Sequence, residues 1–384
     1  MDQISRPCPI CNIDDAVIFF DNRMAAVADF DMSYTVVRCK HCGFYFAQKL
    51  ADLNTLSSYY QTVSKYDLTN SLTPMDQRRI EFSLDLLNNQ IGKNSKIADL
   101  GCGTGAFLGA LKKAGWKDLQ GIDPAPNASM NALKMYDIHG VMCGNLSNAH
   151  EILNLDAVDL ICIMSVLEHL PNLRQDLTRL FSRLKFGCRI FIEVPAVEFF
   201  TNPESEPFGE FSLEHIQYFD SNSLHNLMNS LGAETLELVL VELPIVASGA
   251  LIGLFEWKGQ APLNPNFQYL NTNCMEVYKD QSQEKLNLAI SRIPDGPLII
   301  YGAGSHTARL LTHLEVLSDC LIHSIVDNNP NLVGKKIGKW TVQPTSVIAH
   351  SPEIPVLVSS FRSQNAIAAA LSATVPNPII LMYQ

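Results

Sequence analysis

The sequence lacks both a long apolar stretch and a signal-like beginning. No uninterrupted apolar run approaches the about 18 residues that a membrane-spanning helix needs. The first residues, Met-Asp-Gln-Ile-Ser-Arg-Pro-Cys, show no charged segment followed by an apolar one, which would mark a secretory signal. We therefore expect no membrane partner and a cytoplasmic location, where cysteines stay reduced.

Positive charge is also scarce. The chain carries 28 lysines and arginines against 39 acidic residues, a formal net charge of −11 at pH 7. A net negative charge repels polyanions, so we expect no nucleic-acid partner and a small-molecule substrate instead. A length of 384 residues is enough for two or three domains.

Six of the ten cysteines have no metal-ligand spacing, and we assign them to packing, since a free cysteine behaves as a small apolar residue; they are Cys102, Cys143, Cys162, Cys188, Cys274 and Cys320. The other four form two C-x-x-C turns separated by 27 residues, namely Cys8 with Cys11 and Cys39 with Cys42. This spacing is typical of a four-cysteine zinc ribbon. Four thiolates leave no open position on the metal, so the expected zinc is structural. A redox pair is the alternative.

Strand-like apolar runs alternate with helical stretches in the middle of the chain, at residues 96–100, 119–122, 159–164, 189–194, 235–242 and 251–257. Such alternation predicts a doubly wound parallel sheet, and the last two runs, with no helix between them, predict an antiparallel hairpin at its edge. Further runs at 298–301, 321–326, 356–359 and 379–382 predict a second, smaller α/β sheet. We expect an α/β protein with three domains: a zinc-binding ribbon at 1–60, a Rossmann-like core at 61–258 and a small Rossmann-like domain at 259–384.

Residues 97–107 have the features of a cofactor loop. A strand ends at Asp99, three glycines at 101, 103 and 105 turn the chain, and a helix follows. The glycines let a ligand approach the backbone closely, while a carboxylate before the loop suits an ammonium group better than a phosphate. Asp123 lies 20 residues beyond Gly103, where an acid can bind two ribose hydroxyls. Asn145, after the third strand, is a candidate adenine contact.

The segment Asp-Leu-Gly-Cys-Gly-Thr-Gly at 99–105 resembles the first motif of class I methyltransferases, which bind S-adenosylmethionine (SAM). With the ribbon before this core and a domain opening with Tyr-Gly-Ala-Gly after it, the whole chain resembles the nucleotide-deoxysugar C-methyltransferases. The resemblance implies a nucleotide-sugar substrate. It places Ser165, in Ser-Val-Leu-Glu-His-Leu, beside the cofactor.

The same resemblance assigns the chemistry to Leu-Glu-His-Ile-Gln-Tyr-Phe at 213–219. It implies that His215 is the base that removes a sugar proton next to a 4-keto group, and Glu214 is a candidate to orient it. The Tyr and first His of the family segment correspond to Ser212 and Leu213. A tyrosine at position 59, 60 or 66 is a candidate to supply the missing hydroxyl.

Several alternatives remain from the residues alone. The nearest is O-methylation of a sugar or another small acceptor, again with His215 as base. Others are a non-catalytic SAM-binding protein and an oxidoreductase built on residues 298–330. For the loop Gly302-Ala303-Gly304, followed by Asp327, a structural role or closure over the substrate ranks first, a bound nucleotide second and NAD third. Glu168 and His169 either line the site or cap a turn.

Overall fold

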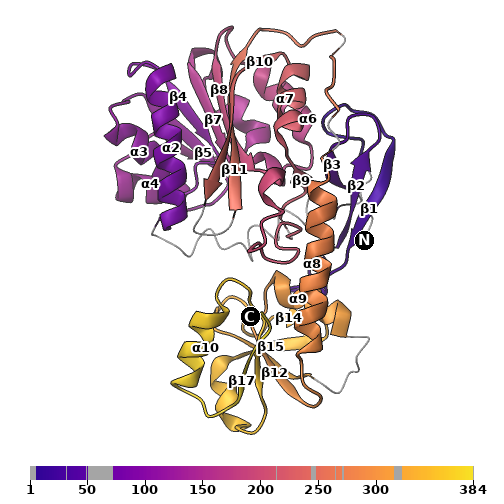
Figure 1. Ribbon diagram of the computed structural model, residues 1–384. Coiled ribbons are helices and arrows are strands. Elements are labelled where there is room, and N and C mark those ends of the chain that lie inside the picture. The colour runs from indigo at the N-terminus through magenta and orange to yellow at the C-terminus, as the bar shows by residue number, and fades with distance from the viewer. Residues whose placement is uncertain are drawn as a thin grey trace.

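The computed structural model describes residues 6–31, 33–48, 50, 72–212, 214–243, 248–263, 265–269, 272–314 and 322–383. The described residues form three sheets (Figure 1). Tyr59, Tyr60, Tyr66, Leu213 and Cys320, all named above, lie outside the described residues.

The central sheet has seven strands in the order β10-β11-β8-β7-β4-β5-β6. They span β4 (Ile97–Leu100), β5 (Leu119–Asp123), β6 (Val141–Cys143), β7 (Leu160–Met164), β8 (Arg189–Pro195), β10 (Ala233–Leu243) and β11 (Ser248–Trp257). Strands β4 to β8 pair in parallel, whereas β11 is antiparallel to both β8 and β10. The predicted sheet and its edge hairpin are confirmed.

Helices cover both faces of this sheet. Successive residues of a strand point to opposite faces. Ile97 of β4 packs with Leu87 of α2 (Pro74–Gln90), in a cluster that also holds α3 (Ala106–Lys113) and α4 (Ala128–Tyr136). Its neighbour Ala98 faces α6 (Leu173–Phe181) and α7 (Ser221–Ser230). The connections contain α5 (Ala149–Ile152) and short 3-10 turns: η2 (Leu146–Asn148), η3 (Leu155–Ala157), η4 (Leu167–His169) and η5 (Val197–Phe199).

The N-terminal sheet is built from two parts of the chain. Its strands β1 (Ala16–Asn22), β2 (Tyr34–Cys39) and β3 (Tyr45–Gln48) are joined by β9 (Gln217–Tyr218), which follows the central sheet's β8 in sequence. All neighbouring strands are antiparallel. Phe46 shares an apolar cluster with Leu177 of α6. The expected ribbon therefore packs on the central unit, and its sheet includes residues far beyond position 60.

Helix α8 (Cys274–Ser291) leads to the C-terminal sheet (Figure 1). This sheet has the order β14-β15-β13-β12-β16-β17, with strands β12 (Leu298–Tyr301), β13 (Ile322–Asp327), β14 (Lys336–Ile337), β15 (Trp340–Pro344), β16 (Val356–Val358) and β17 (Ile379–Leu381). Its helices are α9 (Ser305–Leu314), η7 (Thr345–His350) and α10 (Gln364–Ser372). The pattern predicted this sheet but missed β14 and β15, because neither contains an apolar run.

The cysteines without metal-ligand spacing do not all pack in the core. Cys102, Cys162 and Cys188 are buried, as expected, and Cys274 is half-buried. Cys143 is exposed because it ends the edge strand β6, so the packing assignment was wrong there. Among the described residues, no helix combines the length and apolar character needed to cross a bilayer.

Candidate active site

The glycine loop after β4 is shaped by close contacts that only glycine allows. Gly101 has φ +92°, and a Cβ there would lie 2.4 Å from Cγ2 of Val166. The loop is fixed from β5 by Asp123, whose two carboxylate oxygens accept hydrogen bonds from the N–H groups of Gly103 and Ala125, both at 2.8 Å. The predicted loop and the predicted ribose-binding acid are thus in direct contact.

Asp99, at the foot of this loop, is buried, and its Oδ1 has no hydrogen-bond partner among the described residues. Burial and the nearby Asp123 raise the pKa of Asp99 to about 7. A buried carboxylate without a partner is costly, so a cation that reaches it gains a strong hydrogen bond. The Asp99 carboxylate can accept a hydrogen bond from the ammonium group of SAM, whereas it would repel a phosphate group.

The two remaining predicted cofactor residues have partners of their own. Asn145 is exposed, and its Oδ1 accepts hydrogen bonds from Ser147 and Asn148, which caps η2. Ser165 follows β7 with φ +53°, and its Oγ accepts a hydrogen bond from Arg79 of α2. Arg79 also lies 2.6 Å from the carboxylate of Glu193 on β8. No local sequence pattern links α2 to β8, so this ion pair leaves no signal in the sequence.

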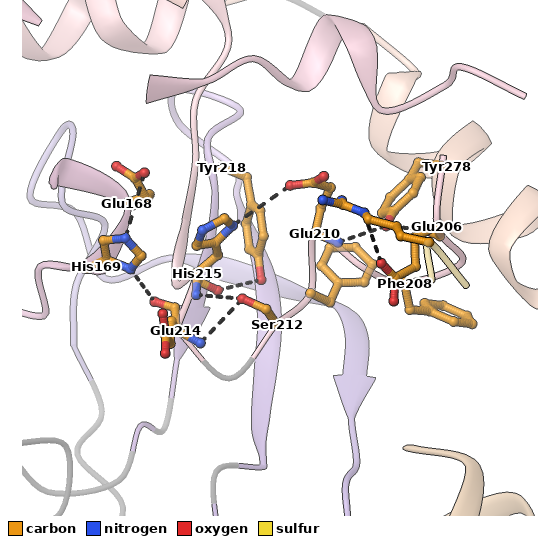
Figure 2. Close-up of polar contacts among 12 residues, drawn as sticks. Glu168, His169, Glu206, Phe208, Glu210, Ser212, Glu214, His215, Tyr218 and Tyr278 are labelled. Carbon is orange, nitrogen blue, oxygen red and sulfur yellow. Dashed lines mark hydrogen bonds and ion pairs between the residues drawn. The ribbon is translucent and has the colours of Figure 1, made fainter. Parts of the chain in front are cut away.

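The segment around His169 meets the segment around His215 (Figure 2). The two imidazole rings lie 5.1 Å apart between centroids. Nδ1 of His169 is 3.1 Å from the carbonyl oxygen of Glu214, and the Ile216 N–H donates to the Glu168 carbonyl at 2.9 Å. Since Val166 touches the glycine loop, these contacts connect the cofactor loop to His215 through one short stretch of chain.

Carboxylates surround His215. Its Nδ1 lies 3.7 Å from Oε2 of Glu210, and its side chain is 26% exposed. Burial alone would lower the pKa of His215, but Glu210, Glu168 and Glu214 outweigh it and raise the pKa above its ordinary value.

The neighbouring histidine has the opposite character. Burial and the nearby His215 lower the pKa of His169 to about 4, so His169 is neutral at pH 7. Its Nε2 lies 3.7 Å from Oε1 of Glu168, a carboxylate that is 1% exposed. Glu210, which the sequence analysis did not single out, thus contacts His215, whereas Glu214 contributes its carbonyl oxygen to His169.

Within the part of the chain that the structure describes, two groups of side chains could hold a metal ion. The first is the predicted set Cys8, Cys11, Cys39 and Cys42, whose sulfur atoms lie within 4.8 Å of one another. Two of the Sγ pairs, 8 with 42 and 11 with 39, are 3.5 Å apart, close to the about 3.8 Å edge of a tetrahedron with Zn–S bonds of about 2.3 Å. The second is Glu168, His169 and His215.

The second glycine loop repeats the hydrogen bonding of the first. Gly302 has φ +109°, and the Ala303 and Asn329 N–H groups donate to the two oxygens of Asp327 at 2.7 and 2.8 Å. The first residues of α9 line a small hollow together with the segment from Glu206 to Ser212. The three roles weighed for this loop stay predictions.

Comparison with known proteins gives a domain match. Residues 75–238 match a family model described as a methyltransferase domain. The mitochondrial ubiquinone biosynthesis O-methyltransferase of Dictyostelium discoideum is 26% identical, over 31% of this chain and 44% of that protein. The chain therefore spans less than half the length of this curated relative.

Solved structures of methyltransferases are also similar. The 1,6-didemethyltoxoflavin-N1-methyltransferase of Burkholderia thailandensis has a TM-score of 0.44 and 14% identity, over 57% of this chain and 97% of that one. The N-methyltransferase NodS of Bradyrhizobium japonicum has a TM-score of 0.40 and 18% identity, over 53% and 96%.

The sheet order and the glycine loop at 101–105 define a Rossmann-like fold of the class I methyltransferase type. Residues 75–238 form a methyltransferase domain, as the family match states for this part of the chain.

Proposed function

We propose that this protein transfers a methyl group from SAM to the carbon next to the keto group of a nucleotide-linked keto-deoxysugar, with His215 as general base. The observation that carries the proposal is the place of His215, beside the segment that touches the cofactor loop and among carboxylates that favour its protonated form. Asp99, Gly101, Gly103, Gly105, Asp123, Asn145 and Ser165 are proposed as the cofactor residues.

A carbon nucleophile has to be generated before it can be methylated. When bound, SAM supplies an electrophilic methyl group on a sulfonium. His215 would accept the proton from the carbon beside the ketone, leaving an enolate whose carbon is the nucleophile for this methyl group. The electron pair of the broken C–S bond would stay on sulfur. A histidine suits the first step because its pKa lies near the operating pH.

O-methylation of a small acceptor is the second candidate. It is supported by the name of the curated relative, an O-methyltransferase, and by the group Glu168, His169 and His215, which could hold a divalent cation against an acceptor oxygen. In that reaction the nucleophile is a hydroxyl oxygen, and no proton bound to carbon exchanges.

We also propose that the four-cysteine group holds a structural zinc ion. Its thiol donor set and S···S separations support this role. Two of the ligands precede β1, and the other two lie at the end of β2 and in the turn between β2 and β3, so the ion would tie these two turns together.

Deuterium exchange separates the two methyl-transfer candidates. The protein is incubated in deuterated water with nucleotide-linked 4-keto-deoxysugars, without SAM and then with it, and the products are followed by mass and by the site of label. We expect exchange next to the ketone without SAM and methylation at that carbon with it. His215→Asn should abolish exchange and keep SAM binding, whereas His139→Gln, on an exposed histidine, should change neither. Methylation of hydroxyl acceptors with no sugar exchange would replace the proposal by O-methylation.

A further inference from the structure

We propose that Glu210 is the positioning residue of His215, holding the imidazole through Nδ1 so that its other ring nitrogen is left for proton transfer. The inference rests on the proposed role of His215 as base. The contact is direct: Oε2 of Glu210 and Nδ1 of His215 are 3.7 Å apart, and the Glu210 side chain is only 15% exposed (Figure 2). A carboxylate at this ion-pair distance stabilises the imidazolium that forms when the base takes its proton.

The backbone around Glu210 is held from outside the catalytic domain. The Glu210 N–H donates to the hydroxyl of Tyr278 at 2.9 Å, and that hydroxyl lies 3.1 Å from the Glu206 carbonyl oxygen. The Phe208 N–H donates to Oγ of Ser282 at 3.0 Å. Tyr278 and Ser282 both belong to α8, so this helix fixes the loop before any substrate arrives.

A second anchor comes from the C-terminal domain. Arg309 of α9 is buried and donates to the Phe211 carbonyl at 2.6 Å and to Oδ1 of Asn22 at 2.6 Å. With α8 on one side and α9 on the other, the loop 206–211 presents Glu210 at a defined place. Such preorganisation is what a residue that orients a base requires.

Glu214, the acid next to His215 in sequence, is held differently. Its carbonyl oxygen faces His169, and its N–H donates to Oγ of Ser212 at 3.3 Å. The charged and titratable groups that act on His215 are Glu210, Glu168 and Glu214, together with the neighbouring His169. Of the three carboxylates, Glu210 makes the ion-pair contact with the His215 ring. Replacing Glu210 should therefore have the largest effect on the pKa of His215.

The test compares Glu210→Gln with Glu214→Gln, using Glu204→Gln, on an exposed acid of the same connection, as the matched control. The His215 ring is titrated by NMR in the full-length protein, with His215→Asn to assign its signal. We expect Glu210→Gln to lower the titration midpoint by about 1 pH unit, since a nearby opposite charge shifts a pKa by roughly that much or more. Glu214→Gln should lower it less, and Glu204→Gln should not move it.

The kinetic arm measures deuterium exchange of the keto sugar against pH. Glu210→Gln should lower kcat at least tenfold with KM changed less than threefold, and should move the pH midpoint in step with the NMR value. If Glu210 has a purely structural role, Glu210→Gln leaves the pH midpoint unchanged, and this result would overturn the inference. A larger shift of the midpoint in Glu214→Gln than in Glu210→Gln would overturn it too.

The two proposals can fail separately. If the wild-type protein exchanges no sugar, the proposed function fails, while the NMR titration still decides whether Glu210 controls His215. Strong broadening of the His169 and His215 signals by substoichiometric Mn²⁺ would place a metal at these rings and overturn the positioning role.

Discussion

Two ionisable side chains of this candidate active site, Asp99 and His215, have pKa values above their ordinary values. Oδ1 of Asp99 has no hydrogen-bond partner among the described residues, and burial with Asp123 nearby raises the pKa of Asp99 to about 7. His215 is half-buried, and three carboxylates raise its pKa. The first residue is suited to receive a cation, and the second to hold a proton.

The pKa of Asp99 predicts a pH-dependent cofactor affinity. Below about pH 7 the carboxyl of Asp99 is protonated in the free protein, so cation binding has to release that proton. The cofactor affinity should therefore fall about tenfold for each unit by which the pH drops below about 7. Calorimetry with S-adenosylhomocysteine at pH 5.5 to 8.5 measures this without methyl transfer. Asp99→Asn should bind roughly 10- to 100-fold more weakly at pH 8, as expected for loss of a charged hydrogen bond, and should lose the pH dependence.

Asp118→Asn, on an exposed aspartate of the same domain, is the control and should behave as wild type. An affinity that is flat with pH in the wild-type protein would exclude Asp99 as the partner of the ammonium.

The raised pKa of His215 predicts the sign of the pH–rate profile. A general base acts in its neutral form, so exchange of the keto sugar should increase with pH and reach half of its plateau above the ordinary histidine value of about 6.5. Initial rates from pH 5 to 9 provide the midpoint. A rate that declines over this range would indicate that His215 acts as an acid instead.

At the scale of elements, the cofactor loop is defined locally and the N-terminal sheet is not. The loop depends on residues close in sequence, such as the glycines that follow β4. In contrast, the N-terminal sheet is completed by β9, from residues 217–218, which pair with Tyr45 and Phe46. Zinc at the four-cysteine group would therefore stabilise a sheet that extends to the strand following His215.

Loss of one ligand should remove the metal. In Cys39→Ser we expect the zinc content, measured by elemental analysis, to fall from about one per chain to near zero, and the melting temperature to fall by several degrees, because binding to the folded state stabilises it. Cys143→Ser, on an exposed cysteine outside the group, should keep the metal and the stability. Zinc retained in Cys39→Ser, or absent from the wild type, would contradict the site.

Across the whole molecule, the three predicted domains meet at one side chain. Arg309 belongs to the C-terminal domain, Phe208 and Phe211 to the loop before His215, and Asn22 to the N-terminal sheet. The N-terminal segment also reaches the C-terminal domain through the Ala25 N–H, which donates to the Ala308 carbonyl at 2.8 Å. The predicted domain boundaries at residues 60 and 258 thus separate units that are joined by the hydrogen bonds of one buried side chain, Arg309.

Arg309→Met should destabilise the protein by about 2–4 kcal/mol, because several buried acceptors lose their charged donor. Denaturant unfolding measures this loss. The same variant should slow sugar exchange, since the loop that carries Glu210 loses its anchor. Arg23→Met, at an exposed arginine paired with Asp21, should cost less than about 1 kcal/mol. Equal stability of the two variants would show that Arg309 does not hold the three parts together.

Prediction from sequence succeeded where the chemistry is local. Apolar runs at 97–100 and 160–164 form β4 and β7, and the glycine spacing identifies the loop. It failed for Cys143, because strand position in the sheet decides exposure, and for β14 and β15, because strands without an apolar run leave no signal. Glu214 stays a predicted candidate to orient His215, and the structure adds Glu210, which lies within ion-pair distance of the His215 ring.

The sequence by itself determined the cofactor loop, the acid at Asp123, the four-cysteine spacing and the α/β alternation, since each depends on residues within one or two elements. Only the tertiary structure decided which groups control the site. Arg79 and Glu193 are 114 positions apart, and Arg309 and Phe211 are 98 apart. Contacts over such separations arise from how sheets and helices pack. The periodicity of a sequence reports only on neighbouring residues, so it cannot predict these contacts.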